Sequence, residues 1–94
     1  MKVWGLLRNH HKIAKDVVQE FNTDGRPNSL ESWTPVIGEL CQALDLSRPV
    51  ILQKHIDELA RFSRTTFRPA DFMEPVHFQR FEIEIFPEPK KNEM

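Results

Sequence analysis

The chain has 94 residues, with 13 basic and 14 acidic side chains, a net charge of −1, and 39% hydrophobic residues. This length supports one hydrophobic core and excludes two domains that each bury a core of their own. The charge balance offers no excess of Lys and Arg for non-specific binding to nucleic acid. Cys41 is the single cysteine, which fits a reducing compartment, and no apolar run approaches the ~20 residues of a membrane helix. We therefore expect a cytoplasmic protein without membrane contact.

Two strands joined by a short turn are predicted at the N-terminus. Residues 2–8 alternate between two faces, and residues 9–11 form a polar turn. Residues 12–21 follow as a second strand, with Ile13, Val17 and Phe21 on one face. The apolar positions of this segment also fit a helical stripe, so a helix is the alternative there. The short turn and the Val17-Val18 pair favour the hairpin.

Two helices are predicted after a loop at residues 22–29. The first begins at Thr34-Pro35, because Thr caps free N–H groups and Pro is tolerated in the first turn. Its apolar stripe is Ile37, Leu40, Cys41 and Leu44. Ser47 is the predicted cap of the second helix, which runs to about Ser63. So few residues separate the two that we expect a helical hairpin.

The C-terminal part is predicted to hold one more strand. Residues 64–77 are interpreted as a connector, and the alternation in residues 78–86 indicates a half-buried strand. The expected fold is α+β, in the order β-β-α-α-β, with a small antiparallel sheet covered on one face by the helical hairpin. Residues 1–87 form the single domain and residues 88–94 a disordered tail. The predicted core is Val3, Leu7, Ile13, Val17, Ile37, Leu40, Leu44, Leu52, Ile56, Leu59, Phe62, Phe81, Ile83 and Ile85.

The residue pattern indicates no catalytic site, metal or cofactor. The histidines and Cys41 show none of the spacings of a metal site. Cys41 and His55 are the one nucleophile–base pair to consider, but Cys41 is expected to be buried as a small hydrophobic residue. Glu82 and Glu84 share a strand face about 7 Å apart, which we interpret as a solvated face.

The hairpin segment resembles a helix-turn-helix. Residues 37–49 (IGELCQALDLSRP) are similar to the turn region of bacterial winged-helix regulators, and the resemblance extends over residues 37–59. It implies that a hairpin over residues 35–63 binds DNA through Arg48, Gln53 and Lys54. Asp45 stands where that family usually has Gly in the turn, so nucleic acid is the less favoured partner.

The connector carries the other candidate surface. Arg and Phe alternate through it, and both residue types are enriched in binding hot spots. The candidate partner-binding residues are Arg61, Arg64, Phe67, Arg68 and Phe72. The alternative is that the rings seal one end of the core and the Arg side chains lie over them. Stretches including residues 46–49 and 67–76 also look like those of short uncharacterised bacterial proteins. This resemblance implies a bacterial source and does not point to any particular activity.

The leading hypothesis is thus a small non-catalytic binding or adaptor domain for an unidentified protein partner. DNA binding through the hairpin is the alternative, and an enzyme is third. A sheet edge such as residues 12–21 is also predicted to pair with a second copy of the chain.

Overall fold

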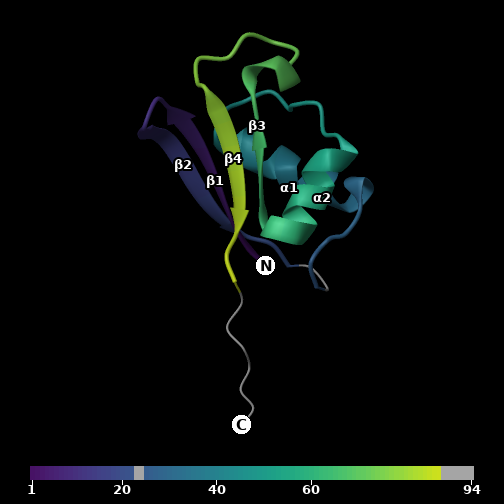
Figure 1. Cartoon of the computed structure of the whole chain (residues 1–94). Coiled ribbons are helices and arrows are strands. Elements are labelled where there is room, and N and C mark those ends of the chain that lie inside the picture. The colour runs from purple at the N-terminus through teal and green to yellow at the C-terminus, as the bar shows by residue number, and fades with distance from the viewer. Residues whose placement is uncertain (23–24, 88–94) are drawn as a thin grey trace.

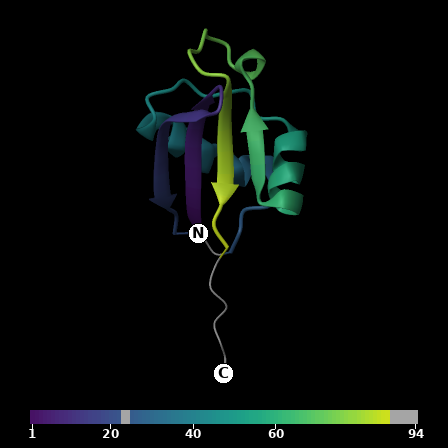
Figure 2. The ribbon, with the colours of Figure 1, turned by 60° about the vertical axis from the view of Figure 1, so that its left-hand side comes forward.

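The computed structural model describes residues 1–22 and 25–87, so the predicted tail at residues 88–94 lies outside the described residues. Four antiparallel strands form one sheet in the order β2-β1-β4-β3, and both helices cover the same face of it (Figures 1 and 2). The α+β class, the antiparallel sheet and the covered face are confirmed. The elements are β1 (Lys2–Asn9), β2 (Lys12–Glu20), α1 (Leu30–Ala43), α2 (Gln53–Phe62), β3 (Arg64–Phe67), the short 3₁₀ helix η1 (Pro69–Asp71) and β4 (Arg80–Ile85).

The N-terminal hairpin forms as predicted, and residues 12–20 are a strand. His10 lies in the turn between the two strands, where it has a left-handed φ of 62°. The pairing of β1 with β2 shifts between Leu7 and Arg8, so Lys15 lies opposite Leu7 whereas Ile13 lies opposite Arg8. This irregularity turns Ile13 to the uncovered face, where it is 44% exposed, and its predicted place in the core is wrong.

Helix α1 begins at Leu30, earlier than the predicted start at Thr34-Pro35. Ser29 is the N-cap: its hydroxyl accepts from the Ser32 N–H at 3.1 Å, and the Ser32 hydroxyl accepts from the Ser29 N–H at 3.1 Å. Pro35 therefore lies inside the helix and removes one helical hydrogen bond. Burial of one apolar stripe outweighs that cost; the stripe is Trp33, Val36, Ile37, Leu40 and Cys41.

The prediction that Ser47 caps the second helix is also wrong, because α2 begins at Gln53. Residues 44–52 form a longer connection than the tight turn expected. Within it, Pro49 bridges to Phe72, and the Val50 N–H donates to the Asp71 carbonyl at 2.7 Å. These contacts hold the segment extended against the chain that follows β3, so it cannot start a helix at Ser47.

The predicted connector contains a fourth strand. β3 spans Arg64–Phe67 and pairs with β4, with Thr65 opposite Ile83 and Phe67 opposite Phe81. Ser63 turns the chain out of α2 with a φ of 60°, so β3 follows the helix directly. β3 and β2 are the two edges of the sheet.

The core lies between the helices and the covered face of the sheet. Ten of the predicted core residues are buried: Val3, Leu7, Ile37, Leu40, Leu44, Ile56, Leu59, Phe81, Ile83 and Ile85. Val17 is partly buried, while Leu52 and Phe62 are 45% and 65% exposed. Leu52 precedes α2 and Phe62 ends it, so neither lies on the buried face of the helix. Cys41 is buried as expected, and the buried hydrophobic residues that the predicted core lacks are Leu6, Phe21, Trp33, Val36, Phe67, Phe72 and Phe78.

Replacing the true helix cap is expected to destabilise the protein. Ser29→Ala removes the hydroxyl that accepts from the Ser32 N–H, and loss of such a cap costs about 1 kcal/mol. Ser47→Ala is the matched control, because exposed Ser47 begins no helix, and it should change the free energy of unfolding by less than about 0.5 kcal/mol. Urea unfolding of both variants measures the difference; equal losses would contradict the assignment of Ser29 as the cap.

Candidate functional site

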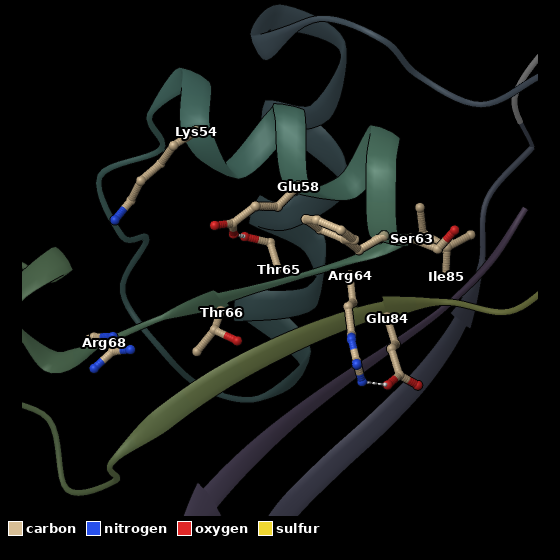
Figure 3. Close-up of a pocket in the computed structure, with 10 residues that line it drawn as sticks. Lys54, Glu58, Ser63, Arg64, Thr65, Thr66, Arg68, Glu84 and Ile85 are labelled. Atoms are coloured by element: carbon tan, nitrogen blue, oxygen red, sulfur yellow. Dashed lines mark hydrogen bonds and ion pairs between the residues drawn. The ribbon is translucent and has the colours of Figure 1, made fainter.

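A hollow of about 630 Å³ opens between α2 and the edge strand β3 (Figure 3). Its volume is within the range of pockets that bind ligands. We call it the α2–β3 groove, and its lining residues are Lys54, Glu58, Phe62, Ser63, Arg64, Thr65, Thr66, Arg68, Glu84 and Ile85. It lies at the side of the sheet, where a partner has access to both a helix and a strand edge.

The helix wall of the groove is one face of α2. Lys54, Glu58 and Phe62 are four residues apart in succession, so their side chains line up along the helix. The opposite face carries His55, Ile56 and Leu59 into the core. The polar side of an amphipathic helix is thereby turned toward β3, with Phe62 as the apolar residue at its C-terminal end.

The strand wall is the outer edge of β3. The Ile85 N–H donates to the Ser63 carbonyl at 2.8 Å, which makes residues 63, 65 and 67 the positions that bond to β4. The backbone N–H and C=O groups of Arg64 and Thr66 therefore point away from β4, along the free edge of the sheet. This edge has the geometry of a template for one more strand.

Two polar contacts hold the groove in shape. The Thr65 hydroxyl donates to Glu58 Oε1 at 2.6 Å and ties the strand to the helix. Arg64 lies 3.5 Å from Glu84 on the neighbouring strand. Both groove carboxylates thus have partners, whereas the exposed side chains of Lys54 and Arg68 form no ion pair with any residue that the structure describes.

The predicted partner-binding residues separate into three groups. Arg64 and Arg68 line the groove. Phe67 and Phe72 are 0% and 8% exposed, so they belong to the core and are not available to a partner. Arg61 is exposed on α2 but does not line the groove.

The structure places the three residues predicted to contact DNA in different surroundings. Arg48 lies in the connection before α2, over Gly38 of α1, where an added Cβ would be 2.8 Å from Arg48 Nε. Gln53 donates to Asp57 Oδ1 at 3.2 Å on the exposed side of α2. Lys54 is the one of the three that lines the α2–β3 groove.

The candidate nucleophile and base are both sealed in the core. Cys41 is 1% exposed, and burial raises the pKa of its thiol to about 11, against the opposing effect of Arg48. A thiol with that pKa stays protonated and unreactive at neutral pH. Glu82 and Glu84 lie on the uncovered face of the sheet, and Glu82 is paired with Arg8 at 2.9 Å and Arg80 at 3.3 Å.

His55 is buried in the core and orders the start of α2. Its Nδ1 accepts from the Leu52 N–H at 3.0 Å, and its ring stacks on Phe67 with centroids 4.1 Å apart. Because Nδ1 accepts, the ring proton of the neutral form is on Nε2, which lies 3.9 Å from Asp71 Oδ2. Burial lowers the pKa of His55 below its ordinary value of 6.5, and the nearby Asp71 carboxylate only partly opposes this effect.

Sequence reasoning missed Glu58, Phe62, Thr66 and Glu84 as groove residues. The spacing of Lys54, Glu58 and Phe62 was the available signal, because it places them on one helix face. Phe62 was instead assigned to the core. No sequence pattern could have shown Thr66 to be at a sheet edge without first identifying β3.

Comparison of the chain with protein-family models, with curated proteins and with solved structures found no match. No helix in the described part of the chain is long and apolar enough to cross a membrane. Within residues 1–22 and 25–87, no three His, Cys, Asp or Glu side chains are placed to hold a metal ion. The geometry of the α2–β3 groove is therefore the basis for the functional inference.

The buried thiol is expected to resist modification in the folded protein. At pH 8, Ellman's reagent should leave Cys41 unmodified in buffer, because the thiol is both inaccessible and protonated. The same reagent in denaturant should modify one thiol per chain. Native-state modification at the rate seen in denaturant would show that Cys41 is open to solvent.

The stability of the protein should fall as the pH drops below 6.5. The folded-state pKa of His55 lies below its ordinary value, so the unfolded chain binds a proton there that the folded chain does not. The contribution is complete above pH 6.5 and is lost as the pH falls toward the folded pKa, with a slope of at most about 1.4 kcal/mol per pH unit.

Urea unfolding between pH 7.5 and pH 5.5 measures this slope, above the range where ordinary carboxyl groups titrate. His55→Asn should lower stability at pH 7.5 and reduce the slope. His11→Asn, which removes an exposed histidine, is the matched control for the substitution itself. An equal slope in wild type and His55→Asn would contradict the assignment.

Proposed function

We propose that this protein is a small non-catalytic binding domain that takes up an extended peptide segment of a partner protein in the α2–β3 groove. The observation that carries the proposal is a free strand edge facing the polar side of a helix across a hollow of about 630 Å³. An extended chain added there would pair its backbone with Arg64 and Thr66, while its side chains lie against α2. This is recognition by strand addition.

The groove suits a peptide better than a small molecule. Its lining is mostly polar, whereas small-molecule sites are mostly apolar and enclosed. It offers backbone groups from the strand wall and an exposed aromatic ring, Phe62, from the helix wall. Main-chain hydrogen bonds give affinity in such sites, and side-chain contacts give specificity.

The other sheet edge is less suited to pairing. The pairing of β2 with β1 is irregular opposite Leu7 and Arg8. Lys15 of β2 donates from Nζ to the Leu44 carbonyl at 3.2 Å. A distorted strand with charged side chains is a common protection against edge-to-edge association. These features favour β3 over β2 as the interaction edge, and self-association through residues 12–21 stays a prediction.

Blocking the strand edge should abolish peptide binding. Linear peptides selected from a random display library on the folded protein would be tested by fluorescence anisotropy on two variants. Thr66→Pro removes the outward N–H at an edge position that tolerates Pro, and should eliminate binding. Thr66→Ala keeps that N–H and should retain it.

Amide chemical shifts locate the contact. The peptide should shift the N–H signals of Arg64 and Thr66 more than those of β2, and far-UV circular dichroism should show that Thr66→Pro is folded. Equal binding by wild type and a folded Thr66→Pro variant, or shifts confined to β2, would overturn the proposal.

A further inference from the structure

We infer that the α2–β3 groove selects peptides with an acidic side chain at one end and an apolar side chain about four residues away. This inference rests on the proposed function and adds the chemistry of the partner. It follows from an uneven distribution of charge and apolar surface along the groove. Both the α2 wall and the β3 wall have their cation at one end and lead to Phe62 and Ser63 at the other.

Unpaired positive charge gathers at one end. Lys54 and Arg68 lie together at one end of the groove, and Ser63 and Ile85 lie at the other (Figure 3). Glu84 is paired with Arg64, whereas Glu58 accepts from the Thr65 hydroxyl and keeps its negative charge. The three cations and two carboxylates of the lining leave a net charge of +1. Neither Lys54 nor Arg68 has an ion-pair partner among the described residues, so a carboxylate on the ligand would supply the missing partner.

The opposite end offers apolar surface. Phe62 ends α2 next to Ser63, and this residue is 65% exposed. Ile85 also lines the groove. An apolar side chain of the ligand would cover Phe62 there and remove aromatic surface from water.

The two walls set the spacing between the two ligand side chains. From Lys54 to Phe62 the helix rises about 12 Å, at ~1.5 Å per residue. From Arg64 to Arg68 the strand advances about 13 Å, at ~3.3 Å per residue. An extended ligand therefore covers the groove with about four residue steps, which puts its first and fifth side chains on the same side.

The hollow next to Arg68 adds positively charged surface to the Lys54–Arg68 end of the groove. Arg68 also lines a neighbouring hollow of about 510 Å³, whose other ionisable residues are His10, His11 and Arg80. Arg80 is paired with Glu82 at 3.3 Å, so Arg68 is the cation there without a described ion pair. No carboxylate among the described residues lines this hollow. The Asp71 carboxylate accepts from the Arg68 backbone N–H at 2.8 Å but forms no ion pair with its guanidinium, which stays available to an anionic group.

A charge-exchange experiment tests the selection. The probes are three labelled peptides with the core Ile-Thr-Val-Thr-X flanked by two Gly residues on each side, where X is Glu, Gln or Lys. Wild-type protein should bind the Glu peptide about tenfold more tightly than the Lys peptide, with Gln intermediate. Raising the salt concentration should reduce the difference.

The double variant Lys54→Glu/Arg68→Glu should reverse the order and prefer the Lys peptide. Arg61→Glu is the matched control, because Arg61 is an exposed Arg of α2 outside the groove, and it should keep the wild-type order. Thermal unfolding should show that all variants are folded, since the replaced side chains are exposed.

The outcomes separate the two proposals. Equal binding of the three peptides would overturn charge selection and leave strand addition standing. Absence of binding by all three, together with failure of the display selection, would count against the groove as a peptide site. A labelled single-stranded DNA that binds more tightly than the Glu peptide, and loses binding in the double variant, would identify the cationic end as a nucleic-acid contact and overturn the inference.

Discussion

The docking of α2 along β3 is the interaction on which the rest of the structure depends. His55 stacks on Phe67 at 4.1 Å, and Phe67 stacks on Phe81 at 5.7 Å, so the helix, the edge strand and the central strand share one aromatic column. The Thr65–Glu58 hydrogen bond closes the gap between helix and strand at 2.6 Å. Because these contacts also fix the separation of the groove walls, the groove exists only where the core is correctly packed.

Strand alternation lets the four residues of β3 contribute both to the core and to the free edge of the sheet. Thr65 and Phe67 are buried, and their backbone groups bond to β4. Arg64 and Thr66 lie between them, with backbone groups directed to the free edge. The period of two in a strand thus separates structural positions from binding positions within one short segment. At the other edge of the sheet, the irregular pairing of β2 leaves no comparably regular edge.

The sequence predicted those parts of the fold that show long, regular periodicity. The hairpin, the α1 stripe, a second helix that buries Ile56 and Leu59, and the alternation in β4 all form. The predicted helix starts were wrong, because Thr34-Pro35 and Ser47 have the residue types of caps but packing decides where a helix begins. The N-cap positions in the structure are Ser29 for α1 and Leu52 for α2. β3 escaped prediction because four residues (RTTF) are too few to show alternation. Without β3, the sequence could not separate exposed from buried positions in this segment. The candidate partner-binding residues therefore included Phe67 and Phe72, which face the core, together with Arg64 and Arg68.

If the α2–β3 groove binds a peptide as proposed, the exposed side chain of Phe62 would divide affinity from selectivity along it. Phe62 is 65% exposed, and covering the rest of its side chain would contribute at most roughly 1.5–3 kcal/mol. Exposed ion pairs contribute less, about 0.2–1 kcal/mol each, but they act at longer range and discriminate between partners by sign. The Phe62 end would therefore supply much of the binding free energy, and the Lys54–Arg68 end would determine which segment enters and in which orientation. On this proposal neither end alone would specify a ligand, and the separation of the two ends along a single strand edge would do so.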